Sequence, residues 1–430
     1  MRARARRFLA AARHLGGAAC AFALPLAGPS ALPASHGSIS IAAPHGPLLP
    51  GARFPIVTDS GAERTKLVLV GPGRLEGAIY VAPERVAAPA TATVVAGTRE
   101  AAGSLVLHLA AWPATDDLLA VATYDDGLAL HRASDGKLLG LMPLEGGVDD
   151  VAQAGATLVA PSSSAPTLWT IDLSTGASRR TDGVPTGNEV RASRGDVYVT
   201  NRDVDGGGAL TRVRAGIPTR IATGDTAEGL AIDAGGVDGY VANVNDATVA
   251  DVDLAQMRVR RRFRVAERPF SVVLDAPERR IDVVSNVPQT LTRPGGRVEA
   301  VDLNSGKVTQ RSAHFRFPIG AALDARRGRL FVTDEAAGVV AVLDARTLRP
   351  THSPLRACAV PWRPAVDSVR DRLYVPCARS NAIAAFDLRS LAPLAGSPFR
   401  TGGYPLAVTA VRPEAAAVAP ASPRRTDPSR

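Results

Sequence analysis

The sequence contains few of the residues on which most enzyme and cofactor motifs depend. Only 4% of its 430 residues are aromatic, and it has three cysteines and seven histidines. It contains no Cys-x-x-Cys-His segment for covalent haem attachment, and no Gly-x-Ser-x-Gly, His-Glu-x-x-His or phosphate-loop motif. The common hydrolase and metalloprotease chemistries are therefore unsupported, and no metal centre is expected. With so few rings, a core must consist mainly of Val, Leu, Ile and Ala.

Residues 1–34 have the layout of a secretory signal peptide. Five arginines, the last of them Arg13, precede an uncharged stretch of 14 residues from Leu15 to Gly28, and small residues follow as far as Ala34. The stretch is shorter than the roughly 20 apolar residues of a membrane-spanning helix. An uncleaved anchor and a lipid attached to Cys20 are the alternatives. We expect cleavage near Ala34 and a periplasmic or secreted protein.

Little net charge remains once this segment is removed. The formal charge of +9 includes the five arginines of residues 1–34, which contain no acidic residue, so the rest of the chain carries +4. A charge of this size does not favour nucleic-acid binding. No later segment is long and apolar enough to predict a transmembrane helix.

A short phrase recurs along the chain: an aromatic or aliphatic pair, a small residue, and then Asn or Asp. It is intact as Tyr198-Val199-Thr200-Asn201. With its central Val as the anchor, copies stand at residues 121, 159, 199, 241, 284, 332 and 375, at steps of 38 to 48 residues. A period in the low forties, built from short strands, predicts the blades of a β-propeller.

Each repeat can be divided into four strands joined by short turns, which is the make-up of one blade. The first strand often opens with proline, as at Pro269 and Pro318. Seven full sets run from residue 104 to about 400, and three strands within 66–95 and one at 405–411 are left over. Together these predict an eighth blade that closes the ring with N- and C-terminal segments, and seven blades is the alternative. We expect an all-β propeller over 61–412, after a linker or arm at 35–60 and before a disordered tail at 413–430.

These residues resemble the YVTN-repeat family of bacterial and archaeal β-propellers, over roughly residues 104–412. The resemblance implies the fold, and seven blades are common among such relatives. It says little about activity, because the relatives include surface proteins, periplasmic proteins and parts of redox enzymes. The repeats around Val121 and Val159 depart from the phrase, since both lack its Tyr and Asn. Three tryptophans are too few for the periodic tryptophans of propellers that bind quinone cofactors.

Two cysteines, Cys358 and Cys377, remain after export. An oxidising compartment favours their pairing. The repeat places Cys358 just before a first strand and Cys377 at the end of the following second strand, and these points lie at the same end of an antiparallel hairpin. We predict a disulfide between them, with two separate buried thiols as the alternative.

The strand order predicts a common face of the ring, where first strands begin and second strands end. Loops on that face are expected to surround the mouth of the central channel, the usual ligand or partner site of this architecture. The alternative is ordinary turn chemistry, because Asn and Asp side chains often stabilise turns. The candidates are Asn201, Asp203, Asn243, Asn245, Asn286, Asp334, Arg363 and Arg379. His108, on the expected inner strand of its blade, could also face the channel.

Two further patterns could bind ions. Period two places Arg258, Arg260, Arg262 and Arg264 on one face of an outer strand. That face predicts either a charged edge that discourages aggregation or a patch for an anionic surface or polysaccharide. The loop containing Asn201, Asp203, Asp205 and Gly206 has the alternating oxygen atoms and glycine of a calcium loop, but Arg212 stands where a bidentate Glu is needed. At most a partial calcium site is expected, and no other cofactor.

These observations together predict a binding or protein-interaction scaffold. We expect a monomer that takes a protein partner or small ligand at its propeller face. The alternative is a propeller enzyme, lactonase-like or associated with periplasmic redox chemistry, in which acids, bases or metal ligands converge at the channel mouth. Its candidate residues are Arg363, His108, Asp203 and Asp334. A third hypothesis is an envelope protein whose arginine face holds an anionic polymer.

Overall fold

The computed structural model describes residues 37–59, 65–98, 101–113, 117–204 and 207–412, whose regular secondary structure consists of β-strands and one short 3-10 helix, η2 (Ala378–Ser380). The expected signal peptide and C-terminal tail lie outside the described residues. The chain divides into two units, Met1–Gly37 and Ser38–Arg430, and every strand after β1 (Gly37–Ser38) belongs to the second. In the described part of the chain, no helix has the length and apolar character needed to span a membrane.

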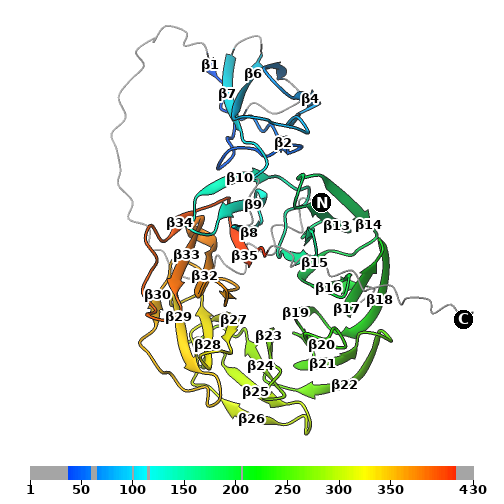
Figure 1. The fold of residues 1–430 in the computed structure, drawn as a ribbon, viewed down its shortest axis with the longest axis vertical. Coiled ribbons are helices and arrows are strands. Elements are labelled where there is room, and N and C mark those ends of the chain that lie inside the picture. The colour runs from blue at the N-terminus through cyan, green and yellow to red at the C-terminus, as the bar shows by residue number, and fades with distance from the viewer. Residues whose placement is uncertain (1–36, 60–64, 99–100, 114–116, 205–206, 413–430) are drawn as a thin grey trace, which may run out of the picture. The chain divides into compact units, whose positions relative to one another are not determined.

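Seven four-stranded antiparallel sheets of the described residues follow one another around a ring (Figure 1). We call them blades A to G and give their strands from the channel outward. Blade A contains β35 (Pro405–Ala410), β8 (Leu118–Thr123), β9 (Gly127–Arg132) and β10 (Leu138–Met142). Blade B contains β11 (Ala152–Ala154), β12 (Thr157–Pro161), β13 (Thr167–Asp172) and β14 (Ser178–Asp182). Blade C contains β15 (Gly187–Ser193), β16 (Asp196–Val204), β17 (Gly207–Arg214) and β18 (Ile217–Gly224).

The remaining four blades repeat this order without interruption. Blade D contains β19 (Ala227–Ile232), β20 (Asp238–Asn243), β21 (Thr248–Asp253) and β22 (Arg258–Arg264). Blade E contains β23 (Pro269–Asp275), β24 (Arg280–Ser285), β25 (Val298–Asp302) and β26 (Val308–Arg311). Blade F contains β27 (Pro318–Asp324), β28 (Arg329–Asp334), β29 (Val339–Asp344) and β30 (Leu355–Arg356). Blade G contains β31 (Ala365–Asp367), β32 (Arg372–Cys377), β33 (Ala382–Asp387) and β34 (Phe399–Arg400).

The last strand of the ring, β35, pairs with the first, β8, with Val408 opposite Val121. This pairing corrects the expected eighth blade, in which residues 405–411 were to join the strands within 66–95. It also removes residues 104–109 from the ring, because the long strand that contains them pairs elsewhere. The described residues thus fit the lower of the two blade counts, and the ring closes where its C-terminal strand meets its first three strands.

The strands before residue 110 form two small sheets of their own. One has the order β1, β7 (Ala101–Leu109), β6 (Ala90–Gly97), β3 (Lys66–Val70); the other has the order β2 (Arg53–Pro55), β5 (Ile79–Val81), β4 (Arg74–Glu76). The expected linker at 35–60 therefore contains two strands, β1 and β2, and the propeller begins at β8 rather than at residue 61. The expectation that His108 faces the channel is also wrong, because it lies on β7 and is exposed.

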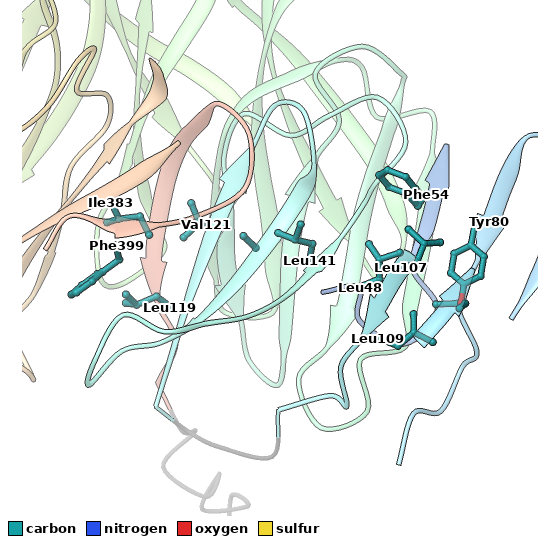
Figure 2. Close-up of a cluster of buried hydrophobic side chains, with 14 of the residues drawn as sticks. Leu48, Phe54, Tyr80, Leu107, Leu109, Leu119, Val121, Leu141, Ile383 and Phe399 are labelled. Atoms are coloured by element: carbon teal, nitrogen blue, oxygen red, sulfur yellow. The ribbon is translucent and has the colours of Figure 1, made fainter. Parts of the chain in front are cut away.

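The N-terminal sheets share a hydrophobic core with blades A and G. The backbone of Leu48 forms parallel β-bridges with Leu109 and with Leu141, and the Leu141 amide donates to the Pro47 carbonyl at 2.8 Å. Figure 2 shows Leu48 and Leu107 on the side of Tyr80, and Val121 and Leu119 toward Ile383 and Phe399. Residues 47–49 therefore cover the outer edge of blade A, which would otherwise be an unpaired strand.

The recurring aromatic residues occupy matching places in their blades. Tyr198, Tyr240, Phe331 and Tyr374 each stand on the second strand and pair with a first strand, opposite Arg191, Ala231, Ala322 and Ala365 respectively. Each packs toward the following blade: Tyr198 contacts the Leu230 and Val241 cluster, and Phe331 the Leu373 and Val375 cluster. The expected radial packing of the repeats is confirmed at these positions.

In two blades the anchor valine is displaced by one residue. Asn201, Ser162 and Ser285 all pair with the residue that opens the first strand of their blade. Tyr198 stands three residues before Asn201 in blade C. The residues three positions before Ser162 and Ser285 are Val159 in blade B and Asp282 in blade E, so these two residues are equivalent to Tyr198. A one-residue offset reverses which neighbour a side chain faces, so these two blades present no aromatic ring to the next blade.

Asp282 is fully buried in that place, and Arg280 accompanies it. Arg280 Nη2 lies 3.1 Å from Asp282 Oδ2, and Nη1 donates to the Arg346 carbonyl at 3.0 Å. Burial raises the pKa of Asp282 to about 7, with Arg280 opposing the rise. The folded state therefore holds this proton more tightly than the unfolded state, where the pKa is ordinary.

We expect the Asp282→Asn variant to lose part of the pH dependence of stability. In the native protein, ionising Asp282 destabilises the folded state, so its contribution falls by about 2 kcal/mol as the pH rises from 5 to 7. Urea unfolding at both pH values checks this. Equal pH slopes for the native protein and the variant would contradict the assignment.

Two inner-strand glycines allow adjacent blades to approach closely. A Cβ on Gly229 would lie 2.7 Å from the Phe270 carbonyl oxygen, and a Cβ on Gly320 would lie 3.0 Å from the Cα of Arg363. Side chains at these points would push the first strands of blades D and F away from their neighbours. The first strands of neighbouring blades therefore lie close together at these two points.

The predicted disulfide between Cys358 and Cys377 is confirmed, with the two Cα atoms 5.7 Å apart. Cys377 is equivalent to Asn201, because its backbone forms an antiparallel β-bridge with Pro361, the residue that opens the first strand of blade G. In blade C, the Asn201 amide donates to the Pro185 and Thr186 carbonyls. The disulfide therefore fixes, by a covalent bond, a turn that other blades fix by hydrogen bonds.

Candidate functional site

The first strands line the channel, and their opening residues are aligned by the pairings described above. The residue after each opening position runs around the ring as Asp149, Asn188, Glu228, Phe270, Ile319, Trp362 and Leu406 in blades B to G and A. The residue after that runs as Asp150, Glu189, Gly229, Ser271, Gly320, Arg363 and Ala407. Blades B to D thus supply a polar side of the channel, and blades E to A supply a largely apolar one.

Six charged side chains meet in the channel, and we call them the channel cluster: Asp150, Glu189, Glu228, Arg191, Arg202 and Arg363. Arg191 lies 2.8 Å from Asp150 Oδ2 and 3.0 Å from Glu189 Oε2. Arg202 Nε donates to Glu228 Oε1. The three carboxylates are buried, whereas the Arg191 side chain keeps 39% of its surface exposed.

Arg363 crosses the channel from blade G. Its Nε lies 3.0 Å from Glu189 Oε1 in blade C, and its Nη2 lies 3.8 Å from Glu228 Oε2 in blade D. Nη1 donates to the Asp149 and Asn188 carbonyls at 3.3 Å. Blades C and D are the two farthest from blade G around the ring, and the side chain is only 8% exposed. Arg363 therefore closes the channel at this level.

The carboxylates of the channel cluster also connect neighbouring first strands. Asp150 of blade B accepts from the Val190 amide of blade C at 3.0 Å, and Glu189 of blade C accepts from the Leu230 amide of blade D at 2.8 Å. Burial raises the pKa of Glu189, and the cations Arg191 and Arg363 oppose the rise. Asp150 and Glu189 therefore connect neighbouring blades in addition to forming part of the charged site.

An aromatic surface adjoins the charged side. Phe270 and Trp362 meet edge to face with ring centroids 6.3 Å apart, and the Arg363 guanidinium carbon lies 5.6 Å and 5.7 Å from the two centroids. Val244 and Ile319 complete a small buried cluster with Phe270. The buried atoms without a hydrogen-bond partner in the described residues include four at this site: Trp362 Nε1, Arg363 Nε and Nη2, and Glu228 Oε2.

Above this level, four side chains form what we call the mouth cluster: Tyr124, Glu335, Arg379 and Tyr404. The Tyr124 and Tyr404 rings meet edge to face at 6.5 Å, and Tyr124 is 45% exposed. Burial raises the pKa of both tyrosines and of Glu335, while Arg379 opposes the rise for Glu335. The mouth therefore presents two aromatic rings, a carboxyl group and a guanidinium group to a ligand or partner.

Several predicted mouth residues stabilise turns instead. Asn201 and Asn243 are buried, and the Asn243 amide donates to the Thr223 carbonyl and to Thr248 Oγ1, both at 3.1 Å. Asp334 accepts from the amides of Arg316 and Phe317 at 2.7 and 3.0 Å. The turn chemistry considered as the alternative describes these three residues.

The other predicted residues are dispersed. Asn245 is exposed and donates to Asp225 and Thr226 side chains, and the Asn286 amide group donates to the Pro318 carbonyl at 3.2 Å. Asp203 belongs to β16, but its side chain lies outside the described part of the structure. Arg363 and Arg379 alone of the eight reach the two clusters.

Sequence reasoning missed Asp150, Glu189, Glu228, Tyr124 and Glu335. A signal was available, because the three acids follow the opening of the first strands of blades B, C and D by one or two residues. Tyr124 and Glu335 immediately follow Thr123 and Asp334, the residues that pair with a first strand's opening. Alignment of the repeats on their first strands would have identified these positions.

The arginine strand β22 is the outer strand of blade D, as expected, but it contains a bulge. Val259 pairs with Val252 and Arg261 with Asp251, so Arg260 is the extra residue. Arg260 and Arg261 both bind Asp251, at 2.6 Å and 2.9 Å, and Arg262 donates to the Thr223 carbonyl at 2.8 Å. Arg258 lies 3.9 Å from Asp253, and Arg264 is exposed at the end of the strand. Much of this charge is already paired within the blade.

The possible calcium loop is only partly visible. Asn201 is described, and its amide oxygen accepts from Thr211 Oγ1 at 2.7 Å, whereas Asp205 and Gly206 lie outside the described residues. Within the described ranges, no group of three or more His, Cys, Asp or Glu side chains has the arrangement of a metal site.

No protein-family model and no curated protein matches the chain. Among solved structures, it is similar to a functionally unknown protein of Desulfotomaculum acetoxidans DSM 771 (TM-score 0.56, 13% identity, covering 69% of this chain and 100% of that one). It is similar to a candidate 6-phosphogluconolactonase of Bacteroides fragilis NCTC 9343 (TM-score 0.57, 13% identity, 69% and 99%). It is also similar to the WD40 β-propeller domain of Doa1 (TM-score 0.50, 13% identity, 60% and 86%). Identities this low show the fold alone, and together with the strand pairings they show that the chain is a β-propeller.

Proposed function

We propose that the chain is an exported, monomeric propeller of the YVTN-repeat type that works as a binding scaffold, with its ligand or protein partner at the channel mouth. The observation that carries this proposal is the closure of the channel by Arg363. Each carboxylate of the channel cluster is bound to an arginine and buried. The accessible polar and aromatic groups lie above this closure, in the mouth cluster.

Photo-crosslinking from the two faces of the ring tests this proposal. Benzoylphenylalanine would replace Tyr124 or Arg379 at the mouth, and Val237 or Val369 on the opposite face, where the valines are 45% and 69% exposed. We expect adducts from positions 124 and 379 after irradiation in the cells that make the protein. Intact-mass analysis distinguishes a small ligand from a protein partner. Adducts from positions 237 and 369 alone, or equal yields from both faces, would place the binding surface elsewhere.

The enzymatic alternative rests on the convergence of Glu189, Glu228 and Arg363, and a lactonase-like activity is the form it would take. Burial raises the pKa of Glu189, as is common for catalytic acids. Its weakness is access, because a substrate would have to displace Arg363 to reach either carboxylate. Lactone hydrolysis that the Glu228→Gln variant abolishes, with the fold intact, would favour the enzyme over the scaffold.

A further inference from the structure

A groove lies between blades B and C, on the face of the ring opposite the channel mouth. Its volume is about 740 Å³, and its rim is formed by the turns that contain Gly155, Gly195 and Gly216. These turns join first to second strands or third to fourth strands, which places them away from the mouth. The groove is thus separate from the site proposed above.

The groove exists where the recurring aromatic residue is missing. In blade G, the Tyr374 hydroxyl lies 3.4 Å from the carbonyl oxygen of Ala133, the residue after the third strand of the next blade. In blade C the residue after the third strand is Ala215, and it lines the groove. Val159 of blade B stands where Tyr374 stands in blade G, and its smaller side chain leaves this space open.

The lining of the groove is polar and cationic above an apolar floor. Val159, Leu168, Val197 and Val213 are buried and form the floor. Thr170 and Arg179 pair across β13 and β14, and Thr170 also pairs with Val159, so Arg179 lies on the face of blade B that carries Val159. Arg194 adds a second cation on the exposed turn between β15 and β16.

Carboxylates are absent from the described residues that line the groove. Arg180, which also borders it, is occupied on the other face of β14 by Asp182 at 2.8 Å and by the Trp169 ring at 5.9 Å. The remaining polar groups are neutral: the hydroxyls of Thr157, Thr181 and Ser193, and the Gln153 amide. The Gln153 amide is held by the backbone of Gly155 and Arg412, and the Thr157 hydroxyl donates to the Ala154 carbonyl, which leaves its oxygen free to accept. The groove therefore offers two arginines and several neutral hydrogen-bonding groups.

We propose that this groove binds a short acidic oligosaccharide. Arginine binds carboxylates by charge-assisted hydrogen bonds, hydroxyl and amide groups suit sugar hydroxyls, and the aliphatic floor suits the C–H faces of sugar rings. The volume lies within the range of roughly 300–1,000 Å³ that small-molecule sites have. Lack of acidic lining residues removes the repulsion that an anionic sugar would meet at the mouth, where Glu335 and the channel carboxylates lie.

Calorimetric titration with trigalacturonate, and with maltotriose as the neutral control, tests the proposal on the full chain. We expect trigalacturonate to bind and maltotriose to bind at least tenfold more weakly. The Arg179→Gln/Arg194→Gln variant should bind trigalacturonate at least tenfold more weakly than the native protein does. A matched variant, Arg356→Gln/Arg400→Gln, removes two exposed arginines from blades F and G and should keep the native affinity.

A second variant fills the groove. Val159→Tyr places in blade B the ring that blades C, D and G have, and we expect it to abolish trigalacturonate binding while the thermal unfolding temperature is maintained. Absence of binding to the native protein, equal affinity for maltotriose, or an undiminished affinity of both groove variants would overturn the proposal. Equal weakening in the matched variant would show general charge attraction instead of a site. Crosslinking at the mouth is unaffected by any of these outcomes.

Discussion

The Arg363→Met variant should lose about 3–5 kcal/mol of unfolding free energy, because it leaves buried carboxylates without their shared cation. Arg363 contacts groups from blades B to E, namely the Asp149 and Asn188 carbonyls, Glu189, Glu228 and the Phe270 ring. Denaturant unfolding followed by far-UV circular dichroism measures the change. The Arg379→Met variant is the control, since it removes an exposed arginine and should cost under about 0.5 kcal/mol.

A further set of variants shows whether the loss of stability comes from uncompensated charge or from lost packing of the Arg363 side chain. If uncompensated charge dominates, adding Glu189→Gln and Glu228→Gln to Arg363→Met should recover part of the stability, a non-additivity expected of groups in one network. A loss below about 1 kcal/mol for Arg363→Met, or strict additivity of the three substitutions, would mean that the channel cluster does not join the blades as described.

The Cys358→Ala/Cys377→Ala variant should lose about 3 kcal/mol, the value expected for a cross-link that closes a loop of this size. The two cysteines are 19 residues apart in sequence, and the bond fixes the turn that enters blade G to the end of its second strand. Thermal unfolding with and without reductant gives the measurement. Reductant should destabilise the native protein to the level of the variant and leave the variant unchanged; a native protein insensitive to reductant under unfolding conditions would contradict the expectation.

The repeat was readable from sequence because each blade repeats the same local problem. A second strand buried on both faces needs apolar residues in succession, and Tyr198-Val199 and Phe331-Val332 satisfy that need in the same way. The disulfide followed from the same alignment. Local patterning and position within the repeat were sufficient for these features.

Pairing partners at the ring's closure were not readable in this way. Residues 101–109 and 405–410 both have the composition of a first strand, and only tertiary pairing decides which of them joins β8. The displaced anchors at Val159 and Asp282 have the same origin, since the phrase Val283-Val284-Ser285-Asn286 admits two registers one residue apart. Spacing alone cannot choose between such registers.

The candidate site was the least predictable part. Asn and Asp at the ends of second strands were predicted as site residues because they are polar. Their short side chains instead form hydrogen bonds with the backbone of neighbouring turns. Arg363 reaches Glu189 and Glu228 only because the first strands approach closely at Gly229 and Gly320. That convergence joins residues 135 or more positions apart in the chain, and no local pattern encodes it.

The pairing of β35 with β8 has a consequence for the order of synthesis. Residues 118–142 emerge early and form three strands of blade A, but the inner strand of that sheet is made roughly 260 residues later. Until residues 405–410 are available, β8 presents an unpaired edge toward the interior, and such edges recruit other chains. Translation that stops within blades F or G would therefore yield an open, aggregation-prone ring. In the completed chain, β35 pairs with β8 and covers this edge.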